Sequence, residues 1–146
     1  MIECLLNQNV RDQGAASFPA INAEVLHLCQ ERAVGLLQLP CPEIAALGCQ
    51  RNRPPGQTLR QAMETEASQA CCRRLAEVSV GRIRDCLDQG QVLLAILGGN
   101  PRSPGCAVHR DAAGRLTAES GVFMTALAAE LKRQGLAAGF LPIRDY

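Results

Sequence analysis

Three cysteines stand where thiols that bind cofactors are often found. Of the eight cysteines in the chain, Cys4, Cys41 and Cys106 lie at or just beyond the ends of short apolar runs or in the loops that follow them. Three thiolates at one site suit zinc with an open coordination position, or a cubane iron–sulfur cluster with one iron left open. Spacing alone does not choose between these cofactors and a set of thiols without metal. The sequence has no Cys-x-x-Cys pair of the kind that structural zinc sites use.

The remaining cysteines are interpreted as structural. Cys49 lies in a loop, where we interpret it as filler rather than an accessory thiol, and His109 is interpreted as a surface histidine rather than a ligand or an acid. Four cysteines fall in segments with helical patterns, where a free cysteine usually packs as a small hydrophobe: Cys29, Cys71, Cys72 and Cys86.

Four short apolar segments are typical of buried strands and would position the three thiols. They are residues 1–6, 34–39, 92–97 and 138–143. Pro40 ends the second segment, because proline has no N–H for a strand ladder. Residues 92–97 are the most apolar run and lie between glycines, which predicts a central strand covered on both faces.

Helical patterns separate these segments. We expect a helix from an N-cap at Ser17 to about Ala33. A second helical stretch starts at a capping box of Thr58 and Gln61, reaches about Asp88 before a stop at Gly90, and is interrupted near residues 79–81. Phe123, Leu127 and Leu131 form one stripe of a third helix, which Gly135 ends.

The alternation of strands and helices predicts an α/β fold. We expect residues 1–146 to form a single domain, a three-layer Rossmann-like sandwich with a mainly parallel sheet of about four strands. Cofactors of open parallel sheets lie at the carboxyl ends of the strands. Cys4, Cys41 and Cys106 are therefore predicted to converge on one edge of the sheet.

Composition argues against several classes of partner. The formal net charge is +1 with interspersed charges, and aromatic residues make up 3% with no Trp, so a nucleic-acid partner is not supported. No segment approaches the roughly 20 apolar residues of a membrane helix. Residues 1–9 lack a basic leader and an apolar signal region, so we expect the cytoplasm, where thiols stay reduced.

Three segments together resemble the thiouracil desulfidase family. They are Cys-Leu-Leu-Asn-Gln-Asn at residues 4–9, Gln-Leu-Pro-Cys-Pro-Glu at 38–43 and Gly-Gly-Asn-Pro-Arg-Ser-Pro-Gly-Cys at 98–106. The resemblance extends over most of the chain, including the Arg-rich loop at 51–55 and the helix from Gly121. Its specific parts are the Cys-Pro-Glu and Ser-Pro-x-Cys elements.

The resemblance implies a 4Fe-4S cluster with three protein ligands, Cys4, Cys41 and Cys106, and one open iron. It further implies that this iron binds the exocyclic sulfur of a thiopyrimidine as a Lewis acid, without net electron transfer, while water attacks the carbon. A small-molecule substrate such as 2-thiouracil would yield uracil and hydrogen sulfide. A monomer or a homodimer is expected.

The resemblance also suggests roles for residues around the thiols. Glu43 would take a proton from the attacking water, although an acidic residue is also favourable at a helix start. Ser103 would bind a ring nitrogen or the departing sulfur, or else be an ordinary turn serine. Gly105 departs from the commoner family pattern, which has serine there, so a hydroxyl role at this position is lost.

Neighbouring glycines and arginines complete this part of the prediction. Gly98 and Gly99 would let the backbone approach the substrate closely. Arg51 and Arg53 would line the entrance and meet a ribose phosphate, but we interpret them as solvated loop charges.

Other functions remain open at this point. The same chemistry could act on 4-thiouridine in transfer RNA, which the near-neutral charge disfavours. A cluster-bearing sensor or electron-transfer protein would need no substrate cavity. A thiol redox enzyme would need a cysteine of low pKa and no metal.

Overall fold

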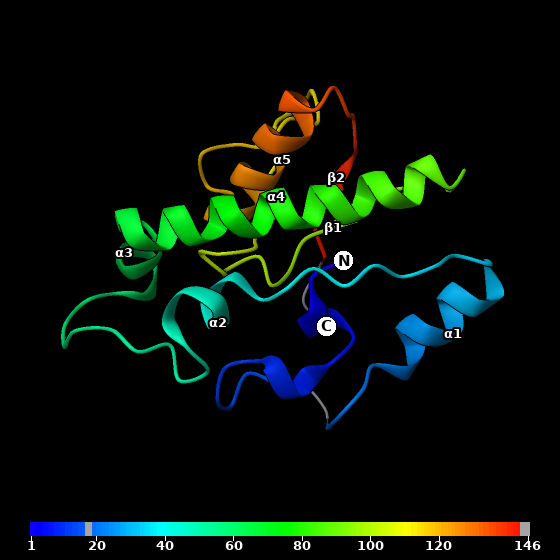
Figure 1. The fold of residues 1–146 in the computed structure, drawn as a ribbon. Coiled ribbons are helices and arrows are strands. Elements are labelled where there is room, and N and C mark those ends of the chain that lie inside the picture. Colours follow the sequence, from blue (N-terminus) through cyan, green and yellow to red (C-terminus); the bar gives the residue numbers. More distant parts are fainter. Residues whose placement is uncertain (17–18, 144–146) are drawn as a thin grey trace.

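Two packed helices dominate the structure, a computed structural model that describes residues 1–16 and 19–143. Helix α4 (Glu66–Asp88) runs across the middle of the molecule, and α5 (Val122–Arg133) lies on one side of it (Figure 1). The N-terminal segments, α1 and α2 lie on the other side of α4 in the same view. The shorter helices are the 3-10 helices η1 (Glu3–Leu5) and η2 (Gln8–Val10), and α1 (Ala23–Glu31), α2 (Pro42–Leu47) and α3 (Leu59–Met63).

The core forms where the apolar stripes of α4 and α5 meet. Phe123, Leu127 and Leu131 recur every four residues and are almost completely buried, as the spacing predicts. On α4, Cys72 and Val80 are fully buried in the same cluster. Burial of one such large apolar side chain contributes about 1.5–3 kcal/mol. This packing holds α5 in place, and α5 in turn supports the loop that carries Cys106.

Helix capping follows the sequence signals in several places. The Thr58 N–H donates to Gln61 Oε1 at 2.9 Å and the Gln61 N–H donates to Thr58 Oγ1 at 3.2 Å, so the predicted capping box is confirmed. Gly90 and Gly135 have φ angles of 85° and 69° just beyond α4 and α5, which confirms both predicted stops.

The predicted interruption near residues 79–81 is wrong. Helix α4 is continuous there. The helical stretch is interrupted instead at Glu64 and Thr65, between α3 and α4. Thr65 Oγ1 accepts the Ser68 N–H at 3.3 Å and caps α4. The helix continues through Gly81 because the buried side chains of Val80 and Ile83 extend its apolar stripe.

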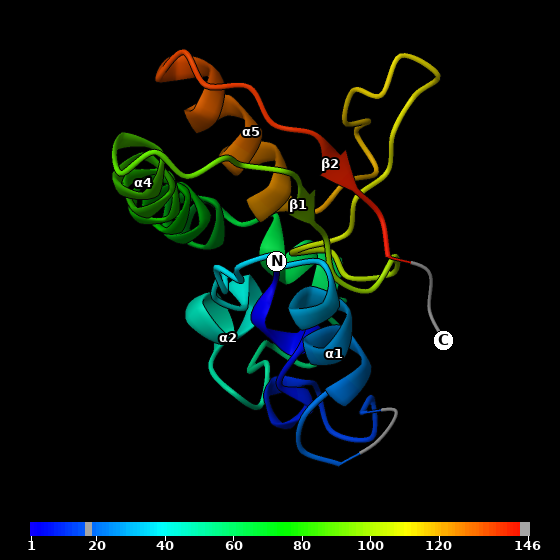
Figure 2. The ribbon, with the colours of Figure 1, turned by 90° about the vertical axis from the view of Figure 1, so that its right-hand side faces the viewer.

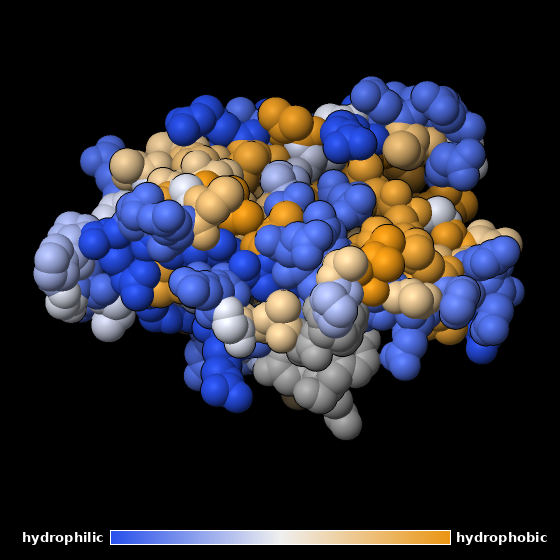
Figure 3. Space-filling model, turned by 90° about the horizontal axis from the view of Figure 1, so that it is seen from below, coloured by the Kyte–Doolittle hydropathy of each residue, from blue (hydrophilic) through white to orange (hydrophobic). Residues whose placement is uncertain are grey.

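Helix α1 starts later than predicted and lies on the surface. Ser17, the expected N-cap, is outside the described residues, and Asn22 Oδ1 caps the helix by accepting the Val25 N–H at 3.2 Å. None of the residues of α1 is buried, and the Leu28 side chain is 55% exposed. Figure 3 shows apolar side chains gathering mainly on the half of the lower face where α1 lies.

The predicted four-stranded Rossmann-like sandwich is wrong. Strands β1 (Ile96–Leu97) and β2 (Phe140–Leu141) pair in parallel and form a two-stranded sheet within a mainly helical molecule. The two strands lie next to each other beside α5 (Figure 2). The first two predicted strands reduce to one parallel bridge between Ile2 and Leu39.

Local geometry explains the shortened strands. The chain turns into η1 directly after Ile2, and Pro40 follows Leu39. Val92 and Leu94 are 77% and 66% exposed, so this run is not covered on both faces as predicted. The Ile2 N–H nevertheless donates to the Leu97 carbonyl at 3.3 Å, which brings η1 next to the end of β1. Among residues 1–16 and 19–143, the helices lack the combination of length and apolar character that crossing a membrane requires.

Candidate cysteine site

The segments that carry Cys4 and Cys106 adjoin each other. Cys4 lies in η1 and Cys106 lies in the loop after β1, where the Cys106 thiol donates to Ser103 Oγ at 3.1 Å. The Cys106 side chain is 4% exposed, whereas Cys4 is half-buried. The hydrogen bond from the Ile2 N–H to the Leu97 carbonyl aligns the two segments.

The start of α5 positions the Cys106 loop. The Val122 N–H donates to the Pro104 carbonyl at 2.9 Å, and the Phe123 N–H donates to the Gly105 carbonyl at 3.0 Å. A Cβ atom on Gly121 would lie 2.3 Å from the Gly105 carbonyl carbon, so only glycine permits this approach. The loop therefore supplies acceptors to the first turn of α5 and is held by it.

Glycines allow close packing around the Cys106 sulfur. A Cβ atom on Gly99 would lie 2.3 Å from Cys106 Sγ, and one on Gly98 would lie 2.5 Å from Val108 Cγ2. The sequence predicts that Gly98 and Gly99 approach a substrate closely. In the structure, these glycines closely approach the side chains of Val108 and Cys106. The Gly99 N–H also donates to the Cys106 carbonyl at 2.8 Å.

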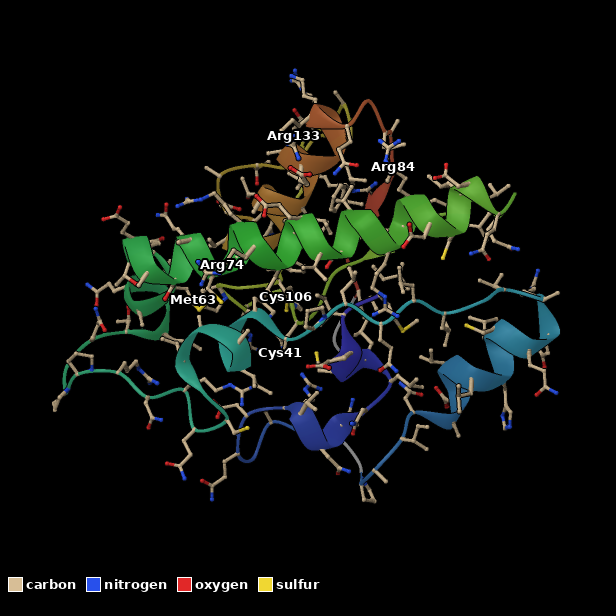
Figure 4. All side chains as sticks on the ribbon, viewed as in Figure 1. Cys41, Met63, Arg74, Arg84, Cys106 and Arg133 are labelled. Atoms are coloured by element: carbon tan, nitrogen blue, oxygen red, sulfur yellow. The ribbon has the colours of Figure 1, made fainter. Side chains whose placement is uncertain are left out.

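Cys41 lies at the N-cap of α2, next to the Cys106 loop. Its N–H donates to Glu3 Oε1 at 2.8 Å. A Cβ atom on Gly105 would lie 2.7 Å from Pro42 Cγ, so the segments of Cys41 and Cys106 are in contact. Both cysteines lie below α4 in Figure 4. The same contact explains Gly105 itself, because a serine there would collide with Pro42.

Glu43 lies between Ser103 and Arg51. Its carboxylate is in the first turn of α2 and the residue is 7% exposed. The Ser103 hydroxyl donates to Glu43 Oε1 at 2.6 Å, while Arg51 Nε is 3.6 Å from Oε2. Ser103 Oγ also accepts the Cys106 N–H at 3.1 Å. Glu43, the proposed base, and Ser103, the proposed hydrogen-bonding residue, are thus joined by a hydrogen bond.

The burial of Arg51 is the feature of the candidate site that the sequence interpretation missed. It is 4% exposed rather than solvated, whereas Arg53 is exposed as predicted. Its Nη1 donates to the Cys49 carbonyl at 2.7 Å, and its Nη2 donates to the Val10 carbonyl at 3.0 Å. A buried carboxylate requires a cationic or hydrogen-bonding partner. The Glu43 carboxylate of the Cys-Pro-Glu element was therefore the signal in the sequence that an arginine could be buried beside it.

The Arg51 guanidinium faces two anionic or polarisable groups. Its Nη2 is 3.8 Å from Cys41 Sγ, in addition to the contact of Nε with Glu43. Arg51 Nε is buried and lacks a hydrogen-bond acceptor. Burying a guanidinium is costly unless anions compensate it, and the Glu43 carboxylate is the anion in contact with it.

The thiols differ in acidity because of their surroundings. The hydrogen bond from Cys106 lowers the pKa of the Cys4 thiol below its ordinary value. The same bond and burial raise the pKa of Cys106, and burial raises the pKa of Cys41. The Glu43 carboxylate adds to both increases and opposes the decrease in the pKa of Cys4. Its charge therefore acts on all three thiols.

The donor set is compatible with an iron–sulfur cluster. In the part of the chain that the structure describes, no group of three or more His, Cys, Asp or Glu side chains is placed to hold a single metal ion. A cubane binds each thiolate through a different iron, so its ligands need not meet at one point. Cys4, Cys41 and Cys106 supply soft donors from three adjoining segments, as such a cluster requires.

The other predicted positions have mixed outcomes. Cys72 is fully buried, which confirms its structural interpretation, and burial raises its pKa to about 12. Cys86 is exposed, so its interpretation as a buried hydrophobe is wrong; Cys49 is also exposed. His109 is half-buried rather than on the surface, with Nε2 2.9 Å from the Pro101 carbonyl oxygen.

Comparison with models of protein families, with curated proteins and with solved structures finds no match to this chain. The resemblance to thiouracil desulfidases therefore stays a prediction that depends on the three sequence segments.

Proposed function

We propose that this chain is an iron–sulfur-dependent hydrolase that acts in the reducing environment of the cytoplasm. The observation that carries the proposal is the buried Glu43 carboxylate, which accepts the Ser103 hydroxyl at 2.6 Å, while the Cys106 thiol donates to the same Ser103 oxygen at 3.1 Å. A carboxylate held next to thiol ligands suits activation of water near a cofactor.

The particular activity proposed is desulfidation of a thiopyrimidine, with 2-thiouracil as the substrate. One water molecule is consumed for each sulfur removed, and the products are uracil and hydrogen sulfide. The family resemblance supports the choice of substrate, and the position of Glu43 beside the thiols supports the hydrolytic chemistry.

Cys4, Cys41 and Cys106 would hold a 4Fe-4S cluster. When bound with one iron free of a protein ligand, such a cluster supplies a Lewis acid that withdraws charge from a thiocarbonyl group. The Arg51 guanidinium, 3.8 Å from Cys41 Sγ, compensates part of the negative charge that the thiolate ligands bring into the site.

Glu43 is the proposed general base. Its Oε1 is occupied by the Ser103 hydroxyl, which orients the carboxylate. Oε2 has the longer contact, 3.6 Å from Arg51 Nε, and is the atom proposed to take the proton from the attacking water. Arg51 keeps the buried carboxylate compensated before the proton arrives.

The test is sulfide release by the protein purified without oxygen and reconstituted with iron and sulfide. We expect about four irons per chain and conversion of 2-thiouracil to uracil with equal amounts of hydrogen sulfide. Bound iron with a reversible redox couple but no sulfide release would instead indicate a sensor or electron-transfer protein. Turnover of 4-thiouridine in transfer RNA, but not of the free base, would favour the alternative substrate.

Cysteine variants test the proposed ligands. Cys4→Ala, Cys41→Ala and Cys106→Ala should each lose most of the bound iron and the activity, because each removes one thiolate donor. Cys29→Ala is the matched control, since this half-buried thiol lies on α1, and it should keep both. Iron content by colorimetry and sulfide release are the two measurements. Equal iron loss in the control would contradict the assignment.

A further inference from the structure

Helix α1 has an apolar stripe that the described residues leave uncovered. None of its residues is buried, and only Val25 and Cys29 are half-buried. Leu28 is 55% exposed, and Ile21, seven residues earlier, is 49% exposed. Figure 2 shows α1 on the outer side of the molecule, and apolar side chains gather on this half of the lower face in Figure 3. The stripe is therefore open to a partner.

A helix as short as α1 depends on contacts with its surroundings. Isolated helices below about 12–15 residues are marginal in water, and α1 has 9 residues. Most helical stability in proteins comes from the packing of an apolar face. Single exposed apolar residues are ordinary on a protein surface, but Ile21, Leu26 and Leu28 are all exposed within one short segment. This segment therefore lacks the packing that its length calls for.

The charges beside Leu28 complement a second copy of the same helix. Glu24, Leu28 and Arg32 follow one another at intervals of four residues, so they lie along one stripe of α1 and its C-cap. Glu24 and Arg32 are both exposed, and neither has an ion-pair partner within the part of the chain that the structure describes. Each lies about 6 Å along the helix axis from Leu28, in opposite directions. A second copy turned end over end about Leu28 therefore places each glutamate opposite an arginine.

We propose that α1 is the interface of a weak homodimer, in which two copies of the helix pack antiparallel about a two-fold axis at Leu28. The two Leu28 side chains form the apolar centre of the contact. Glu24 of each copy lies opposite Arg32 of the other copy, so the two-fold axis produces the same ion pair twice. A parallel arrangement would instead bring like charges together, which is unfavourable.

The charge pattern favours a second copy over other partners. A helix that binds a membrane surface carries Lys or Arg on its polar face, whereas α1 contains Glu24 and Glu31 and neither of those basic residues. A stripe that complements itself fits a two-fold homodimer, the commonest oligomer of soluble proteins. The contact is short, about 13 Å along the two helices, so we expect a weak dimer at the low end of interface sizes. The proposed desulfidase activity is not required for it.

The experiment is sedimentation equilibrium of the full chain at concentrations from about 10 µM to about 1 mM, the range in which a weak dimer forms. The weight-average mass should rise with concentration from near 15.6 kDa towards twice that value. A reductant is present throughout, because the exposed thiols of Cys49 and Cys86 would otherwise crosslink copies. A chain that stays monomeric over the whole range would overturn the proposal.

Charge reversals test the antiparallel pairing. Glu24→Arg gives the stripe two arginines and Arg32→Glu gives it two glutamates, so each variant should repel its own copies and raise the dimer Kd roughly ten-fold or more. Mixed in equal amounts, the two variants should associate more tightly than either does alone, because both contacts then join opposite charges. Glu119→Arg, the same change of charge at an exposed site outside α1, should dimerise like the unmodified chain. A mixture no tighter than its components would refute the pairing.

A substitution at Leu28 tests the position of the axis. Leu28→Asp brings two carboxylates together there and should abolish dimerisation, with the fold checked by circular dichroism. Val78→Asp, at a valine of α4 that is 66% exposed, is the matched control and should keep the dimer. A dimer that survives Leu28→Asp, or one that Val78→Asp disrupts, would contradict the assigned interface. If Leu28→Asp does not fold, the unmodified chain and the mixture of charge variants decide the outcome.

Discussion

Buried opposite charges set the character of the site at the level of single residues. Glu43 and Arg51 are 7% and 4% exposed, and neither charge can rely on water for compensation. Their contact at 3.6 Å is supplemented by Ser103 on the carboxylate and by two backbone carbonyls on the guanidinium. Loss of either partner leaves the other uncompensated, so substitution of either residue should lower stability as well as any activity.

Replacement of the proposed base should lower turnover while the proposed cofactor ligands are kept, and it should also lower stability because Arg51 loses its anion. Glu43→Gln keeps the size of the side chain and an acceptor for the Ser103 hydroxyl, but it cannot take a proton from water. We expect iron content to be unchanged and kcat to fall by about 10²–10⁴-fold. Glu64→Gln, at an exposed carboxylate of α4's N-terminal flank, should leave kcat unchanged. Full activity in Glu43→Gln would remove this residue from the mechanism.

Removal of the buried guanidinium should affect stability as well. Arg51→Met leaves the Glu43 carboxylate buried without a cation, which should lower the free energy of unfolding by about 3 kcal/mol. Arg74→Met, at an exposed arginine of α4, should change it by less than about 0.5 kcal/mol. Urea denaturation measures both. An Arg51→Met protein as stable as the control would show that the charge pair contributes little.

At the level of elements, the first turn of α5 and the Cys106 loop form one unit. The loop carbonyls of Pro104, Gly105 and Ala107 accept N–H groups at the start of α5, which has no side-chain cap. The first N–H groups of α5 have no acceptor within the helix, and the loop that carries the proposed ligand Cys106 supplies acceptors for them. The position of Cys106 consequently depends on how closely Gly121 approaches the loop.

A methyl group at Gly121 should disturb this unit. Its Cβ would lie 2.3–2.4 Å from backbone atoms of Gly105 and Cys106, which cannot move aside like a flexible side chain. Gly121→Ala should therefore lower the free energy of unfolding by about 3 kcal/mol and reduce iron binding. Gly81→Ala, inside α4 with open space around its Cβ, should raise it by about 1 kcal/mol. Thermal and urea denaturation of the two variants provide the comparison.

At the scale of the whole molecule, stability comes mainly from the α4 and α5 core rather than from a sheet. Cys72 lies in this core with no exposed surface, and burial raises its pKa from 9.0 to about 12. The folded protein thus keeps this thiol neutral where the unfolded chain ionises it. The resulting stabilisation is complete below pH 9 and is lost as the pH rises towards 12.

The pH dependence of stability can be assigned to Cys72 by difference. Between pH 7.5 and pH 10.5, the unmodified protein should lose about 2 kcal/mol more free energy of unfolding than Cys72→Ala, because only the former has a buried thiol that ionises on unfolding. Cys86→Ala, at an exposed thiol, should behave like the unmodified protein. Urea titrations under a reductant at both pH values measure the difference. Equal losses in Cys72→Ala and the unmodified protein would contradict the assignment.

Helices were predictable to the extent that local chemistry defines them. The capping box at Thr58, the glycine stops at Gly90 and Gly135 and the apolar stripe of α5 all act within a few residues, so their signals survive in any fold. The sheet was not predictable in this way. Residues 1–6 and 92–97 have the composition of strands, but strand length depends on partners that pair along the whole segment.

Part of the site was also predictable. The order of Cys4, Cys41 and Cys106 predicted three thiols at one edge, and in the structure the segments of Cys41 and Cys106 are in contact at Pro42 and Gly105. The burial of Arg51 was not predictable from its loop, where arginine is usually solvated. Its environment depends on Glu43, Val10 and Cys41, which come from separate segments.

The sequence by itself determined the capping box at Thr58, the glycine stops and the residue types available for chemistry, since these depend on side chains and on neighbours a few positions away. Only the tertiary structure decided the extent of the sheet and the burial of the charged pair. Those features depend on contacts between distant segments, whose free energies become available only when the whole chain packs.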